Sequence, residues 1–99
     1  MMHTMGQLMF GAEAQFELDD RSLAHIETVV LAKLRRNEGF ALTLDEPAGG
    51  QSTLWIHASS VLRFRYAGER PAINRAWLDV LIDAANTPAG MRLLPEPAP

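Results

Sequence analysis

The sequence contains no cysteine, and this absence excludes several kinds of chemistry. Disulfide bonds, thiolate nucleophiles and cysteine-ligated zinc all require a thiol. Long apolar runs are also missing, since no stretch approaches the roughly 20 residues that a membrane-spanning helix needs. The N-terminal "MMHTM" lacks the basic and apolar regions of a signal peptide. These absences predict a cytoplasmic protein with no membrane partner.

Basic residues are scarce as well. The 99 residues carry 9 Lys and Arg against 12 Asp and Glu, a net charge of −3, and Lys33 is the only lysine. A protein with this acidic balance does not gather nucleic acid over its whole surface, although a local basic patch can still do so. A chain of this length predicts one domain with a small core.

A first helix is predicted over residues 19–36. Its apolar residues recur at a spacing that places them on one narrow stripe, Leu23, Ile26, Val30 and Leu34. Asp19 is the expected N-cap, because its carboxylate can accept hydrogen bonds from the first free amides. The cations Lys33, Arg35 and Arg36 lie at the other end, where the helix dipole favours them. Gly39 is expected to end the helix in the left-handed conformation.

A second helix is predicted over residues 75–86, with Asn74 as N-cap and Thr87-Pro88 as its end. Strands are predicted around residues 8–10, 15–18, 40–44, 52–58, 61–66 and 91–94, which gives the order β-β-α-β-β-β-α-β. Tight turns between consecutive strands favour an α+β fold, a mostly antiparallel sheet with both helices on one face. We expect a flexible leader at residues 1–4, a single domain at 5–94 and a proline-rich tail at 95–99.

Four pieces of the chain resemble a known family: "MGQLMFG", "DDRSLAHIETVVLAKLRRNEGFAL", "STLWIHASSVLRFRYAGERPAINRAWLDVLIDAAN" and "MRLLPEP". The family is a small bacterial domain family of unknown function, of about 100 residues. The resemblance covers nearly the whole chain from Met5 onward, which marks Met1–Thr4 as a leader. Some members are labelled "ATP-dependent DNA ligase". That label implies a lysine within a Lys-x-Asp-Gly motif, which carries AMP.

Lys33 does not stand in such a motif, because "KLRR" has no Asp-Gly after the lysine. A chain of 99 residues also cannot supply both a nucleotidyltransferase domain and a DNA-encircling domain. A ligase-like enzyme is therefore the least favoured function. His25 and His57 lack metal-ligand spacing and are expected to be surface histidines. The serines at 59 and 60 fit a turn, so we expect no catalytic residue, no metal and no cofactor.

One candidate binding surface lies on the predicted sheet. Alternation of apolar positions turns Trp55 and His57 outward on one strand, and Arg63 and Arg65 outward on the next. If the two strands pair as a hairpin, all four side chains share one sheet face. Aromatic and arginine side chains on a sheet are typical of platforms that bind single-stranded nucleic acid, and also of protein interfaces. A structural alternative covers the tryptophan with the N-terminal hairpin and pairs the arginines across strands.

A second candidate lies on the first helix, on the side away from its apolar stripe. Its members are Arg21, His25, Arg35 and Arg36. The simpler interpretation of these residues is a solvated helix face. The sequence thus predicts a non-catalytic binding or accessory module whose partner is nucleic acid or protein. The alternative is a homo-oligomeric interaction domain, such as a homodimer across the sheet face.

Overall fold

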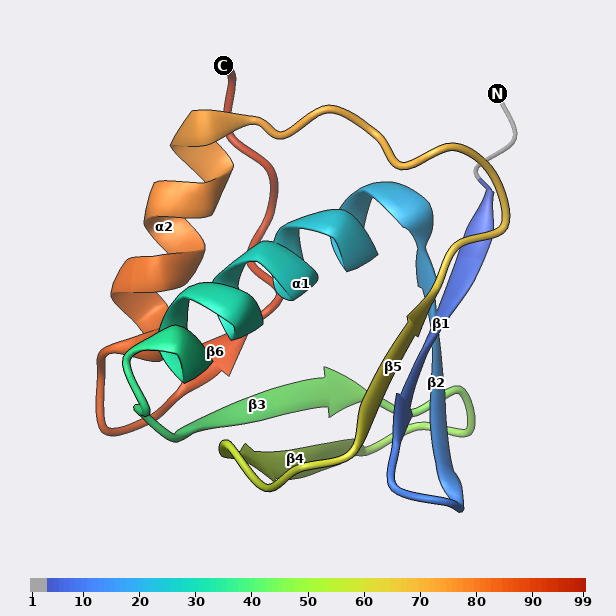
Figure 1. The fold of residues 1–99 in the computed structure, drawn as a ribbon. Helices are drawn as coiled ribbons and strands as arrows, with labels where there is room; N and C mark the ends of the chain where they lie inside the picture. Colours follow the sequence, from blue (N-terminus) through green and yellow to red (C-terminus); the bar gives the residue numbers. More distant parts are fainter. Residues whose placement is uncertain (1–3) are drawn as a thin grey trace.

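The computed structural model describes residues 4–99, so the predicted leader lies outside it except for Thr4. The elements are β1 (Met5–Phe10), β2 (Ala14–Asp19), α1 (Asp20–Arg35), β3 (Phe40–Asp45), β4 (Gln51–Ile56), β5 (Leu62–Arg65), α2 (Arg75–Ala85) and β6 (Met91–Arg92). Figure 1 shows the two helices lying together above β3 and β4. The predicted element order and the α+β class are confirmed. Neither described helix is long and apolar enough to cross a membrane.

The six strands form two sheets instead of one. Sheet A has the order β2-β1-β5 and sheet B has the order β4-β3-β6. All pairs are antiparallel except β3 with β6, which run parallel. β4 and β5 therefore do not form the hairpin considered above. After β4 the chain turns, and a hydrogen bond from the Gly11 amide to the Val61 carbonyl (2.9 Å) fixes the start of β5 beside β1.

The core lies between α1, α2 and the inner faces of both sheets (Figure 1). Alternation along each strand sends one set of side chains inward, and Leu8 of sheet A and Leu42 of sheet B are completely buried. Leu23 and Ile26 of the predicted α1 stripe are also completely buried. Each such side chain contributes roughly 1.5–3 kcal/mol to folding by leaving water. The core therefore joins both sheets and both helices in one apolar cluster.

The two ends of α1 confirm one prediction and correct another. Asp19 is the N-cap, because its Oδ1 accepts a hydrogen bond from the Ser22 amide at 2.7 Å. At the other end Asn37, with φ 57°, is the residue in the left-handed conformation, so the prediction for Gly39 was wrong. Amides of Asn37 and Glu38 bond to carbonyls of the last turn, which is a Schellman motif. An asparagine tolerates this φ and can replace glycine there.

Gly39 serves a different purpose, which is to make room for an aromatic ring. A Cβ atom at this position would lie 2.9 Å from Cζ2 of Trp55 and 3.2 Å from the Ile56 carbonyl oxygen. The indole therefore rests against the main chain just before β3. The glycine thus leaves room for Trp55, which the sequence singles out as a candidate binding residue.

Candidate functional site

Trp55 is 60% exposed and belongs to the outer face of sheet B. Directly paired residues of neighbouring strands point to the same side of a sheet, so this face follows from the register. It consists of Gln51, Thr53, Trp55, Ala41, Thr43, Asp45 and Arg92. The hydroxyls of Thr43 and Thr53 are 2.9 Å apart and bond across the two strands. The face is mainly polar and uncharged, with one tryptophan at one end.

β4 lies at the edge of sheet B, so one side of its backbone has no strand partner in the described chain. Its sequence, QSTLWI, contains no charged residue and no proline. The other edge strands differ. β2 carries Glu17 and Asp19, β5 carries Arg63 and Arg65, and β6 has only two residues. Charges and short length are the means by which edge strands avoid pairing with other chains, and β4 has neither.

Arg63 and Arg65 are exposed, as predicted, but they lie on sheet A. Their pairing partners on β1 are Met9 and Gln7, so the arginines share the outer face of sheet A with these residues. Among residues 4–99, neither arginine takes part in an ion pair. The structure therefore separates the predicted binding residues between two sheets, because β5 pairs with β1 and not with β4.

His57 is exposed and organises the turn that follows β4. Its amide donates to the Ser60 hydroxyl at 3.0 Å, and its Nδ1 accepts from the Ser59 amide at 3.2 Å. The serines thus satisfy turn groups, as the sequence indicates. Val61 comes directly after the turn and is 73% exposed. Val61 and Trp55 are the most exposed large apolar side chains of the described residues. Trp55 lies near the end of β4, and Val61 follows the turn after this strand.

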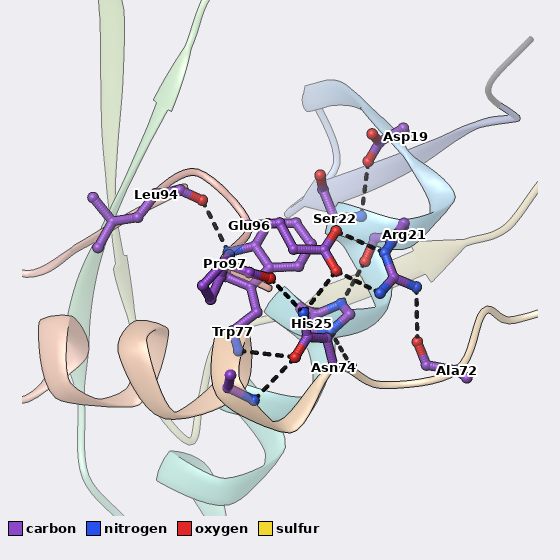
Figure 2. Close-up of polar contacts among 11 residues, drawn as sticks. Asp19, Arg21, Ser22, His25, Ala72, Asn74, Trp77, Leu94, Glu96 and Pro97 are labelled. Atoms are coloured by element: carbon purple, nitrogen blue, oxygen red, sulfur yellow. Dashed lines mark hydrogen bonds and ion pairs between the residues drawn. The ribbon is translucent and has the colours of Figure 1, made fainter. Parts of the chain in front are cut away.

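The second predicted surface is divided. Arg35 and Arg36 are exposed at the end of α1, and Arg21 bonds to the C-terminal segment. His25 is completely buried, so its interpretation as a surface histidine was wrong. The reason is that α2 and the C-terminal segment cover the side of α1 opposite its apolar stripe (Figure 2). The helix is therefore buried on two sides.

His25 joins α1 to the start of α2. Its Nδ1 lies 2.7 Å from the Arg21 carbonyl oxygen, which can only accept, so Nδ1 carries the proton. Its Nε2 then accepts a hydrogen bond from the Asn74 amide at 2.8 Å. The ring lies 4.4 Å from that of Trp77, measured between centroids. Both nitrogen atoms are occupied, so this neutral imidazole has a structural role and is not available to a ligand.

The C-terminal segment is tied to the same cluster (Figure 2). Glu96 accepts two hydrogen bonds from the Arg21 guanidinium, at 2.7 and 2.5 Å, and one from the side-chain amide of Asn74 at 2.9 Å. The hydrogen bonds from Arg21 and then Asn74 lower the pKa of Glu96 to about 2, and the bond to Glu96 raises the pKa of Arg21. The Leu94 carbonyl accepts from Nε1 of Trp77 at 2.9 Å. Part of the expected tail is thus attached to both helices.

Sequence reasoning missed a cleft of about 370 Å³ beside Trp55, between the end of α2 and the start of β3. Lys33 lies on its wall and is only 8% exposed. Its ammonium donates to Oδ1 of Asn86 at 2.6 Å and lies 3.3 Å from Oε1 of Glu38. The lysine thus joins the ends of the two helices. The described residues also contain no group of three or more side chains that could hold a metal ion.

The comparisons with known proteins agree with this picture of a small domain. A family described as a domain of unknown function (DUF7882) matches residues 5–96. The chain belongs to the DUF7882 family. No curated protein and no solved structure matches the chain. The match spans both sheets and both helices, and it includes Glu96 of the C-terminal segment.

Proposed function

We propose that this DUF7882 domain is a non-catalytic binding module that contacts another protein through β4 and the outer face of sheet B. The single observation that carries the proposal is the 60% exposure of Trp55 on an edge strand without charge. Tryptophan is enriched among the residues that dominate protein interfaces. An open strand edge also offers main-chain hydrogen bonds to an extended segment of a partner.

The surroundings of Trp55 support this proposal. The indole lies against the Gly39 main chain, so one side of the ring already has a contact before a partner binds. Val61 lies beyond the turn and adds a second exposed apolar side chain. Asp45 and Arg92 are the only charged residues of the outer face, and their charges cancel. A face of this kind suits a protein partner better than a polyanion.

Nucleic acid is the second candidate partner, and one observation favours it. Arg92 lies in the same row of sheet B as Thr43 and Thr53, so the face that carries Trp55 also carries a cation. Base stacking on an indole with a nearby guanidinium is typical of single-strand binding. Arg63 and Arg65 contribute less to this arrangement than expected, because they belong to sheet A.

A photo-cross-linking experiment separates these partners. A photoreactive phenylalanine replaces Thr53 in the middle of β4, and the matched control replaces Asp79, which is exposed on α2. After irradiation in cells, we expect a protein adduct from position 53 and none from position 79. The adduct should survive nuclease and disappear with protease. An adduct removed by nuclease would favour nucleic acid, and equal labelling at both positions would contradict the proposed surface.

A further inference from the structure

We infer that the partner of β4 is a second copy of this chain, bound edge to edge and antiparallel. The inference rests on the proposed function, since it names the partner of the same surface. In a homodimer with twofold symmetry, the edge strand at the interface pairs with the same strand of the other copy. A strand can form this interface only if its side chains do not repel those of its own copy. This condition can be tested for each described edge strand from its sequence.

Two of the edge strands fail because of charge. Antiparallel self-pairing of β5 would place Arg63 and Arg65 opposite arginines of the partner, and like charges directly opposite each other are destabilising. Self-pairing of β2 would bring Glu17 near its own copy in the same way. The third, β6, has only two residues and cannot form a useful ladder. β4 contains no charge, has six residues and therefore tolerates its own copy.

The register follows from the side-chain faces and from the turn after β4. Directly opposite residues of an antiparallel pair point to the same side of the sheet, so the outer faces of both copies stay on one side only if one residue of β4 lies opposite its own copy at the twofold axis. Thr53 and Leu54 are the two central residues of β4 and are the candidates for this position. An axis at Leu54 would place the His57 turn opposite Gln51 of the other copy. An axis at Thr53 keeps the turn beyond the partner's strand, and it sets each Trp55 opposite a Gln51.

In this arrangement sheet B continues from one copy into the other, and the unpaired edge of β4 disappears. Closing an exposed edge is a recognised way for a sheet protein to avoid uncontrolled pairing. The outer face of the joined sheet carries two tryptophans beside uncharged residues. The joined sheet ends on both sides at β6, whose two residues are too few to support further growth.

Charge-swap variants test the inference. Sedimentation equilibrium should show a monomer–dimer equilibrium for the wild-type chain between micromolar and millimolar concentrations. Thr53→Lys and Thr53→Glu should each weaken the dimer several-fold, because each places like charges at the axis. An equimolar mixture of the two variants should restore the dimer as a mixed pair. Restoration excludes misfolding as the cause of the loss. The control Gln15→Lys on edge strand β2 should leave the equilibrium unchanged.

The contradicting results are distinct. A wild-type chain that stays monomeric up to millimolar concentration overturns the inference, as does a dimer that the Thr53 variants leave intact. In either case a protein adduct of another mass from position 53 would leave the proposed function standing. Absence of both the dimer and the adduct would overturn the inference and the proposed function together.

Discussion

Replacement of His25 tests the claim that this buried histidine joins the two helices. In His25→Phe the ring and its packing on Trp77 are retained, but both nitrogen atoms are lost. The main-chain amide of Asn74, a residue that is 5% exposed, then loses its acceptor, which is Nε2 of His25. A buried donor without a partner costs about 1–3 kcal/mol. The Arg21 carbonyl oxygen still accepts the main-chain hydrogen bond of the helix, so loss of the hydrogen bond from Nδ1 of His25 costs less.

We therefore expect His25→Phe to lower the free energy of unfolding by about 2–3 kcal/mol. His25→Ala also opens a cavity beside Trp77 and should cost about 3–5 kcal/mol. The assay is urea unfolding followed by circular dichroism at neutral pH. His57→Ala is the matched control, because His57 is exposed and loses only the hydrogen bond from the Ser59 amide, which should change the free energy by about 1 kcal/mol or less. A His25→Phe variant as stable as the control would refute the structural role of His25.

Further predictions concern the tryptophan, the arginines and the C-terminal segment. Gly39→Ala should displace the indole of Trp55, which changes its fluorescence, and should lower stability by about 1 kcal/mol; unchanged fluorescence would contradict the contact. Arg63→Ala with Arg65→Ala should cost about 1 kcal/mol or less in thermal unfolding, and an unfolded variant would show that these arginines are structural. Glu96 has a folded-state pKa of about 2, below the ordinary value of 4.5, so its stabilising effect is complete above about pH 5 and lost as pH falls towards 2. The melting temperature of Glu96→Gln should thus lie below that of the wild type at neutral pH and converge with it in acid; a constant difference would contradict the ion pair.

Local sequence signals predicted the elements and several of their ends. The apolar stripe of α1 and the side chains of Asp19 and Asn74 determine where helices form and begin, and these signals act within a few residues. Alternation placed Trp55 on the outward side of its strand but left open whether the N-terminal hairpin covers it; in the structure it is 60% exposed. These features could be predicted because the residues that produce them are neighbours in the chain.

The errors came from contacts between distant segments. β5 pairs with β1 through registers such as Leu8 with Phe64, whereas a hairpin with β4 is the more local arrangement. His25 looked exposed because the α1 periodicity identifies only the face turned to the sheets. Asn74, which covers the other side, lies 49 residues further along the chain. Helix periodicity alone carries no information about a second covering layer.

The cleft beside Trp55 illustrates the same limit. Lys33 looked like one of several cations at the end of a helix, but its ammonium reaches Asn86, 53 residues away. The sequence placed the charge at the correct end of α1 and could not show its partner. The absence of a Lys-x-Asp-Gly motif was a local feature, and it remains the reason to expect no covalent AMP on this lysine.

The most direct test of β4 as the contact surface is amide hydrogen exchange, measured residue by residue in dilute and in concentrated protein. Amides of β4 that point away from β3 have no strand partner in the single chain and should exchange quickly when the protein is dilute. At high concentration the same amides should become protected, while amides of β2 and β5 stay unchanged. Protection that appears on β5 or at the end of α1, with β4 unaffected, would contradict pairing of two copies through β4.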